Sequence, residues 1–397
     1  MTKSIYPLTE SVLEKIDLNA AIKVIKSKKI TMGKKTQEIE KYFKNNVVRT
    51  DSLMVNSGSS ANLLIFQCLI NPLVKKLKVG DEVLIPAICW STSLWPIIQS
   101  GLKVKFVDID INSLNIDLKD LEKKITKKTK ALMLVHALGN CVEMDKLTRI
   151  CKKNKLILVE DACEALGSRF KNKQLGTFGE FSSFSFYYSH HITSGEGGMV
   201  CVKNKKYLDV IKSLRSHGWS RDLSNSGFIS KKYKNIDKNW IFINSGFNLR
   251  PTDINAAIGI QQLKRLKKIL KIRKYNFLKI KKELINNKNY NKQFSILSDQ
   301  KYSNIAWFGI PFMLNSKNKS YKHKVMDKLN QKGVMTRPII SGNFANQPSI
   351  QLYKIKSNTK LPNADLVDKK AFFLGLHNIK ITDNKLKLLV DHIYSSL

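Results

Sequence analysis

Residues 156–168 read LILVEDACEALGS, an apolar run that ends in two adjacent carboxylates, Glu160 and Asp161. Such a run predicts a buried strand of a parallel sheet, and ligands bind at the carboxyl edge of open α/β sheets. A carboxylate at that edge could pair with a cationic ring nitrogen. An aspartate that caps a following helix explains the same pattern equally well.

Five further apolar segments upstream and downstream of this run predict strands: SLMVNS, DEVLIPA, KVKFVDID, KALMLVHAL and SSFSFYY. Helical segments separate most of them, which predicts βαβ units and a mostly parallel central sheet flanked by helices. A long helical pattern over residues 253–285 leads to a mixed region with strands near 304–314 and 334–340 and a closing helix over 384–397. We therefore expect an α/β fold with a large domain over 1–255 and a small α+β domain over 256–397.

The charge of the chain is strongly positive, with 69 Lys and Arg against 31 Asp and Glu and a net charge of +38 over 397 residues. The lysines are spread along the whole sequence, which is typical of solvated faces rather than of one polyanion groove. We therefore expect no nucleic-acid partner, although a positive field would help to attract a phosphate-bearing substrate. Whether the lysine excess has any function is left open.

The cysteines and the apolar runs indicate the compartment. Six cysteines occur without a CxxC pair and without zinc-type spacing, which is typical of a reduced compartment and predicts no metal site. The first residues lack an apolar signal core, and no apolar run is long enough to span a membrane. We expect a cytoplasmic protein without membrane insertion.

Three other segments carry chemistry. NSGSSANL, at 56–63, predicts a strand, a small-residue turn and a helix, and the backbone amides of such a turn bind anions. An ordinary strand–turn–helix connection is the alternative. His190 and His191 lie in a polar loop before a GEGG turn. They either act as an acid or a base in a reaction or are ordinary solvated loop residues. Trp90 follows DEVLIPA, and either stacks on a planar ligand or belongs to the core.

Six ordered stretches resemble the DegT family of nucleotide-sugar aminotransferases, which have PLP fold type I: IPAICWST, KFVDIDINSLNID, VEDACEALGS, GTFGEFSSFSF, GEGGMV and GFNLRPTDINAAIG. They span about residues 30–265. In those aminotransferases a lysine six residues before the glutamate of the GEGG turn forms the Schiff base with PLP. Glu196 fixes that register here, and the position is His190. No lysine lies between Lys173 and Lys203.

One branch of the family, the 4-keto-6-deoxy-sugar 3-dehydratases, carries the same lysine-to-histidine change, and SHHITSGEGG and RPIISGNF (337–344) look like that branch. A sub-branch that acts on CDP-sugars binds a 2Fe–2S cluster through extra cysteines, but no cysteine follows Cys201 here. The resemblance therefore implies a cluster-free enzyme that acts on a GDP-4-keto-6-deoxy sugar, with PLP or PMP bound non-covalently and L-glutamate as the amine donor. The product would be a 4-keto-3,6-dideoxy sugar for surface polysaccharide.

The resemblance also implies roles for single residues around the ring of the cofactor. His190 would move protons in the reaction. Asp161 would pair with the pyridine nitrogen, Trp90 would stack on the ring, and Glu164, which replaces a common glutamine, would contact the ring hydroxyl. For His191 we expect a supporting role, with that of the base as the alternative.

Further positions concern the phosphate and the substrate. Ser185 and the backbone at Gly58 and Ser59 would hold the cofactor phosphate. Asn248 would reach the cofactor phosphate of a partner subunit, because this family builds shared active sites in a homodimer. Candidate sugar or nucleotide contacts are His217, Arg221, Arg337 and Asn343. A surface salt bridge is the alternative for each of the two arginines.

Other functions remain open at this stage. The chain could be an aminotransferase that works without the lysine, or a 3-dehydratase of a CDP- or dTDP-sugar. It could also bind a nucleotide sugar or PMP without catalysis. The sequence does not reveal which nucleotide the substrate carries or which dideoxy sugar is finally made.

Overall fold

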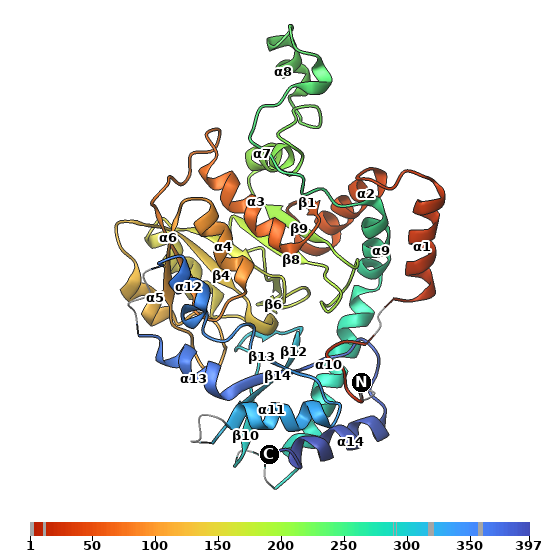
Figure 1. Ribbon diagram of the computed structural model, residues 1–397, viewed down its shortest axis with the longest axis vertical. Helices are drawn as coiled ribbons and strands as arrows, with labels where there is room; N and C mark the ends of the chain where they lie inside the picture. Colours follow the sequence, from red (N-terminus) through yellow and green to blue (C-terminus); the bar gives the residue numbers. More distant parts are fainter. Residues whose placement is uncertain (1–3, 11–12, 289, 291, 317–320, 356–359) are drawn as a thin grey trace.

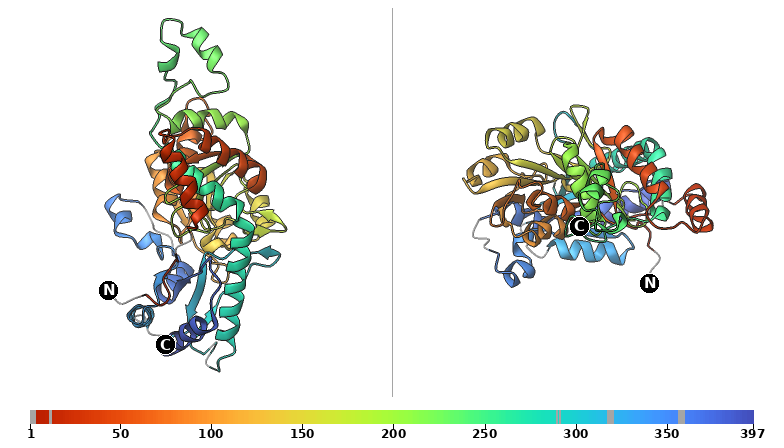
Figure 2. Two further views of the ribbon diagram at one scale, coloured as in Figure 1. Left: turned by 90° about the vertical axis from the view of Figure 1, so that its right-hand side faces the viewer. Right: turned by 90° about the horizontal axis from the view of Figure 1, so that it is seen from above.

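The computed structural model describes residues 4–10, 13–288, 290, 292–316, 321–355 and 360–397. Figure 1 shows a large upper body, a smaller lower body and an arm around α8 that stands away from the upper body. The side view in Figure 2 shows the same arm and the long helix α10 running down one side of the molecule. The α/β class predicted from the sequence is confirmed.

A seven-stranded sheet in the order β1-β9-β8-β5-β4-β2-β3 forms the centre of the upper body. All of its strands are parallel except β9, which is antiparallel to both β1 and β8. The six strands predicted from the sequence are present, whereas β9 was not predicted. The bounds are β1 Asp51–Val55, β2 Glu82–Pro86, β3 Lys103–Val107, β4 Thr129–Val135, β5 Ile157–Asp161, β8 Phe181–Ser185 and β9 Gly198–Val202.

Helices cover this sheet, and α3 packs against β8, β9, α4 and α7. β8 and β9 are buried along their whole length, as expected for strands that lie inside a layered fold. The helical bounds are α1 Lys15–Lys26, α2 Lys34–Phe43, η1 Lys44–Val48, α3 Gly58–Ile70, α4 Ser91–Gln99, α5 Leu118–Lys124, η2 Ala137–Gly139, α6 Met144–Lys153, α7 Lys205–Arg215, α8 Ser226–Lys232 and η3 Lys238–Trp240.

The lower body contains a four-stranded antiparallel sheet in the order β10-β12-β14-β13. The sequence predicted β12 and β13 but not β14, which is central. The strand bounds are β10 Phe294–Ile296, β12 Gly309–Leu314, β13 Thr336–Pro338 and β14 Ala371–Gly375. The helices are α11 Tyr321–Gln331, η4 Phe344–Asn346, α12 Pro348–Leu352, α13 Pro362–Lys370 and α14 Asp383–Tyr394. A small third sheet joins β6 Arg169–Phe170, β7 Lys173–Gln174 and β11 Ser303–Asn304.

Two helices join the bodies where the sequence predicted one. α9 Asp253–Lys264 and α10 Leu266–Ile285 meet at Arg265, whose backbone (φ −97°, ψ 2°) leaves the helical region. Tyr6 pairs with Val334 and its hydroxyl donates to the Gly375 carbonyl, so the N-terminal segment lies against the lower body. A division into domains at residues 255 and 256 remains a proposal.

Candidate active site

Asp161 ends β5 at the carboxyl edge of the sheet, with its side chain held from two helices. Its Oδ2 accepts hydrogen bonds from Asn62 of α3 (2.9 Å) and from the hydroxyl of Ser93 of α4 (2.7 Å). Its Oδ1 accepts from the Cys163 amide (3.1 Å). Turns rather than a helix occupy 162–168, so the helix-cap alternative does not apply. The carboxylate is therefore fixed in place as an acceptor.

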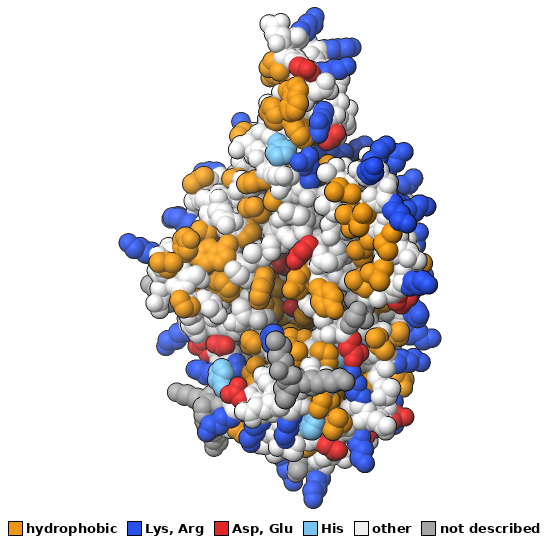
Figure 3. Space-filling model, turned by 45° about the vertical axis from the view of Figure 1, so that its right-hand side comes forward, with side chains coloured by type: hydrophobic (Ala, Val, Ile, Leu, Met, Phe, Trp, Pro, Cys, Tyr) orange, Lys and Arg blue, Asp and Glu red, His pale blue; other side chains and the backbone are white. Residues whose placement is uncertain are grey.

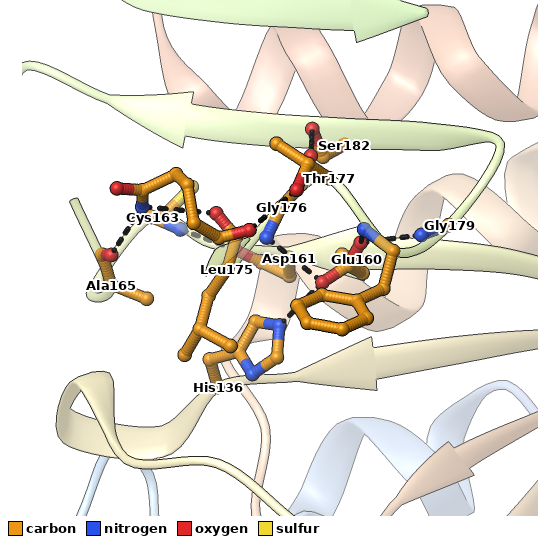
Figure 4. Close-up of polar contacts among 12 residues, drawn as sticks. His136, Glu160, Asp161, Cys163, Ala165, Leu175, Gly176, Thr177, Gly179 and Ser182 are labelled. Carbon is orange, nitrogen blue, oxygen red and sulfur yellow. Dashed lines mark hydrogen bonds and ion pairs between the residues drawn. The ribbon is translucent and has the colours of Figure 1, made fainter. Parts of the chain in front are cut away.

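Glu160 points to the other face of β5 and holds a loop there. Its carboxylate accepts from the amides of Gly176 (2.8 Å), Phe178 (2.7 Å) and Gly179 (2.6 Å), and it pairs with His136 Nε2 at 2.9 Å (Figure 4). Burial by itself would raise the pKa of Glu160. The contact with His136 and the backbone amides outweigh it and lower this pKa below its ordinary value. Glu160 is therefore an ionised structural anchor beside Asp161.

The N-terminus of α3 forms a narrow cradle between β1 and β8. Ser57 caps the helix by accepting from the Ser60 amide (3.1 Å), and the helix begins at Gly58. A Cβ atom at position 58 would lie 2.8 Å from Cys163 Sγ and 2.8 Å from Ser185 Cβ. Only glycine leaves this space open. Amides and the helix dipole point toward an anion placed there.

Ser185 and Ser59 lie on either side of this cradle. Ser185 ends β8, and its hydroxyl contacts only the Tyr187 amide, at a long 3.3 Å, among the described residues. Ser59 pairs with the Thr92 hydroxyl at 2.7 Å, which connects α3 to the start of α4. The role of these residues as phosphate contacts stays a prediction.

Glu164 is half-buried in the turn after β5. Its Oε2 accepts from the Leu138 amide at 2.7 Å. Burial raises the pKa of Glu164 to about 8, the Leu138 amide lowers it, and the charge of Asp161 raises it. The group is therefore largely a neutral acid at neutral pH.

The two histidines differ in their surroundings. Burial lowers the pKa of His190 to about 4, while the Cys163 backbone and the charge of Asp161 oppose this change. The His190 ring packs against Phe308 with centroids 5.1 Å apart, and its Nδ1 has no partner within the described part of the chain. His190 is therefore a neutral imidazole able to accept a proton. His191 is fully buried and its Nε2 contacts the Ala306 carbonyl at 2.7 Å, which suits the predicted supporting role.

The segment that packs on His190 is itself anchored. Arg273 of α10 is buried and donates to the carbonyls of Trp307 (2.9 Å) and Phe308 (2.8 Å) and to Asn378 Oδ1 (2.9 Å). Asn378 in turn donates to the His191 carbonyl (3.1 Å). Burial lowers the pKa of Arg273 to about 9. The lower body thus fixes the histidine loop through backbone contacts.

Trp90 precedes α4 and is 57% exposed, so the core alternative does not apply to it. The RPIISGNF segment lies beside it, because Ser341 donates to the Cys89 carbonyl (2.6 Å). Arg337 is exposed and donates to the Thr336 carbonyl without a salt bridge among the described residues. Asn343 is buried, donates to Asp365 (2.8 Å) and caps η4, so its polar atoms serve the fold; its substrate role stays a prediction.

The remaining candidates lie at the base of the arm. Arg221 is exposed and stacks on the Trp219 ring at 3.7 Å, while its contact with Asp222 is a weak 4.0 Å pair. The His217 ring lies 4.8 Å from the same tryptophan. Asn248 is exposed, and its Oδ1 accepts from Arg250 (3.0 Å). These residues are available to a ligand or a partner but lie outside the group around Asp161.

Sequence reasoning missed several residues of the site. Asn62 lies four residues after Gly58, one helical turn further on the same face, and this spacing could have identified it. Ser93, His136, Ala306 and Phe308 carry no local signal, because each acts across the fold.

The site fits pyridoxal phosphate. A glycine cradle at a helix N-terminus suits its phosphate, a preorganised Asp161 suits its ring nitrogen, and the exposed Trp90 offers a face for its ring. Within the described residues, no three His, Cys, Asp or Glu side chains gather in a way that could hold a metal ion. The same residues include no helix that is long and apolar enough to cross a membrane.

Comparisons with known proteins show which proteins the chain resembles. The profile of the DegT/DnrJ/EryC1/StrS aminotransferase family matches residues 12–393. The chain is 35% identical over 381 residues to GDP-4-keto-6-deoxy-D-mannose 3-dehydratase of Escherichia coli O55:H7, covering 95% of this chain and 97% of that one.

Two solved structures of a GDP-4-keto-6-deoxymannose-3-dehydratase are also similar to it. One contains a trapped PLP-glutamate geminal diamine, and the other is a mutant with bound GDP-perosamine. For each, the TM-score is 0.90 at 33% identity, covering 98% of this chain and 100% of the other.

Proposed function

The chain belongs to the DegT/DnrJ/EryC1/StrS aminotransferase family, and we propose that it removes the C3 hydroxyl of GDP-4-keto-6-deoxy-D-mannose as a PLP- and PMP-dependent 3-dehydratase. The observation that carries this proposal is the neutral, half-buried imidazole of His190 beside Asp161, where the resemblance expects the lysine of an aminotransferase. The similarity to named 3-dehydratases over nearly the whole chain supports it.

When bound, the cofactor supplies the amine from L-glutamate and the electron sink for loss of the hydroxyl. Asp161 keeps a proton on the ring nitrogen, because Asn62 and Ser93 hold its carboxylate in place. His190 takes the proton from the carbon that carries the amine and returns a proton to the departing C3 oxygen. Its lowered pKa keeps the imidazole ready to accept that proton at neutral pH. Ser185 and the amides at Gly58 and Ser59 bind the phosphate.

A histidine at position 190 suits dehydration better than transfer of the amine to the sugar. A lysine would bond to the cofactor and displace the amine, whereas imidazole forms no stable covalent bond of this kind. The aminated cofactor then remains free to drive elimination. Hydrolysis releases ammonia and a 4-keto-3,6-dideoxy sugar, a precursor that fits surface polysaccharide. We propose a cluster-free enzyme, since no cysteine follows Cys201. We also propose that it acts in the cytoplasm.

We further propose a homodimer with shared active sites. Hydrophobic side chains gather over α1 and on the projecting arm in Figure 3. Those on α1 are Ile16, Leu18, Ile22 and Ile25, each about half exposed in the single chain, and those on and beside the arm include Phe228, Trp240 and Phe242. Apolar side chains that gather on the surface in this way indicate that a partner covers them. Light scattering after gel filtration should give twice the mass of one chain, and a monomer at micromolar concentration would contradict the dimer.

Mass spectrometry of products tests the activity. The purified protein is incubated with PLP, L-glutamate and GDP-4-keto-6-deoxy-D-mannose, with the CDP- and dTDP-sugars in parallel. A product that lacks one oxygen atom, with 2-oxoglutarate released, supports the 3-dehydratase and identifies the nucleotide. A product with an amine in place of the carbonyl would show an aminotransferase. No product from any of the sugars, with cofactor bound, would favour a binding protein.

A further inference from the structure

A cavity of about 440 Å³ lies at the amino edge of the large sheet, away from the candidate active site. Ile157 and Phe181, the first residues of β5 and β8, line it. Asp161 and Ser185 end the same two strands at the opposite edge. Strands of this length separate the two edges by about 13 Å, so the cavity is not part of the site around Asp161. Its volume lies within the range of about 300–1,000 Å³ that is typical of small-molecule sites.

The floor of the cavity is apolar and firmly packed. Leu69 of α3 and Leu158 of β5 are buried there. Phe181 and Tyr207 are buried as well, and their rings stack with centroids 5.1 Å apart. An organic group placed on this floor would lose contact with water along one face, which favours binding.

One wall of the cavity is a loop that the fold already anchors. Phe178 and Gly179 line the cavity, and their amides donate to the Glu160 carboxylate at 2.7 Å and 2.6 Å (Figure 4). The Phe178 carbonyl accepts a hydrogen bond from the Lys203 ammonium at 2.7 Å. This wall is therefore formed before any ligand binds.

Three lysines from separate parts of the chain border the cavity. Lys76 comes from the connection between α3 and β2, Lys152 from the end of α6, and Lys203 from the connection after β9. Among the described residues, none of the three ammonium groups lies within ion-pair distance of a carboxylate, and Lys203 uses a neutral carbonyl instead. Burial lowers the pKa of Lys203, and the charge of Lys173 lowers it further, while two nearby glutamates oppose this change. Positive charge is thus concentrated here without an acidic partner in contact.

The stability of the helices does not explain this set of lysines. A lysine in the last turn of a helix stabilises the helix end, which accounts for Lys152 alone. Lys76 lies in a connection, and Lys203 lies two residues before the start of α7, where the helix dipole disfavours a cation. Within the described part of the chain, Glu180 is the one carboxyl group that lines the cavity, so positive charge exceeds negative charge.

We propose that this cavity binds a small organic phosphate, with its phosphate bound by Lys76, Lys152 and Lys203 and its organic part placed over the apolar floor. Lysine ammonium groups bind phosphates as point charges and need no fixed geometry. The floor favours an ester with an organic part over inorganic phosphate, because apolar burial adds to the attraction between charges. Nucleotides belong to this class of ligand.

Isothermal titration calorimetry of the purified full chain with ADP tests the site. ADP carries both a phosphate and an organic part, and it is not the nucleotide of the substrate proposed above. The variant K76Q/K152Q/K203Q removes the charges at the cavity. Its matched control, K78Q/K153Q/K205Q, removes the same number of exposed lysines from the same segments of the chain but outside the cavity.

ADP should bind to the control within about threefold of wild type, and to the cavity variant at least about tenfold more weakly. Pyrophosphate and adenosine, which each lack one part of the ligand, should both bind wild type more weakly than ADP. T148W narrows the cavity without a change in charge, because Thr148 of α6 lines it and is half-buried. It should weaken ADP binding about tenfold or more. Urea unfolding checks that each variant is folded, and the charge variants decide alone if T148W is not.

The outcomes that would overturn the proposal are distinct from those that concern the reaction. An equal loss of affinity in the cavity variant and its control would assign ADP binding to the general positive field of the chain. Unchanged affinity in the cavity variant or in folded T148W, or no binding of millimolar ADP to wild type, would also overturn the site. None of these measurements uses the dehydration reaction, so their failure leaves the proposed function untouched.

Discussion

Replacing Glu160 by glutamine should lower the free energy of unfolding by about 3–6 kcal/mol. The carboxylate accepts four hydrogen bonds, from His136 and from the amides of Gly176, Phe178 and Gly179. A glutamine keeps one oxygen and places an NH₂ group against the two donors on the other side. Each lost bond to a buried charge costs about 1.5–3 kcal/mol, and two such losses give the range above.

Urea unfolding followed by circular dichroism, at one protein concentration, measures this effect. The matched control is E180Q, which changes a half-exposed carboxyl group in the same loop and should stay within about 0.5 kcal/mol of wild type. A loss below about 1 kcal/mol for E160Q would refute the anchoring role.

The pH dependence supplies an independent check on Glu160. Because its folded pKa is lowered from the ordinary 4.5, its contribution is complete above that value and is lost as pH falls below it. The stability gap between wild type and E160Q should therefore shrink on acidification. A gap that widens toward low pH would contradict an ionised Glu160.

Three further substitutions test the site and its support. H190N should lower turnover by about 10²–10⁴-fold, measured as dehydrated product, with PLP affinity within about threefold of wild type; undiminished turnover would remove His190 from the mechanism. G58A should weaken PLP binding about tenfold or more, because its Cβ would sit 2.8 Å from Cys163 Sγ, and an unchanged affinity would contradict the phosphate cradle. D253A should lower the free energy of unfolding, measured in urea, by about 2–4 kcal/mol. Asp253 caps the start of α2 by accepting hydrogen bonds from the amides of Gly33, Lys35 and Thr36 and from the Thr36 hydroxyl. A decrease below about 1 kcal/mol would make that cap unimportant.

Most of the fold follows from local patterns in the sequence. The strands that these patterns failed to predict were missed for physical reasons. The six predicted strands of the large sheet are apolar runs between helical segments. β9 directly follows the Gly-rich turn, so its five residues are difficult to separate from that turn. β14 begins at Ala371 immediately after α13 ends at Lys370, without a glycine or proline to mark the change. Periodicity also could not show that the helical pattern breaks at Arg265.

The sequence predicts which residues of one segment belong to the candidate site, but not which residues from other segments they contact. Adjacent residues of a strand point to opposite faces, so Glu160 and Asp161 had to serve different neighbours. The structure shows Asp161 directed at α3 and α4 and Glu160 at the loop 176–179. The alternation was available from the sequence, but the identity of the neighbours was not, because Ser93 comes from α4 and His136 from the turn after β4.

The protonation state of His190 depends on contacts between the two bodies. His190 owes its low pKa first to burial, and the Phe308 ring from the lower body packs against it at 5.1 Å. Arg273 holds Phe308 through the backbone, and Asn378 holds His191 in the same way. A histidine in an open loop would have an ordinary pKa and would be partly charged at neutral pH. The cover that the lower body gives to this loop therefore keeps the imidazole at position 190 neutral, and the residues that form this cover act on His190 through burial.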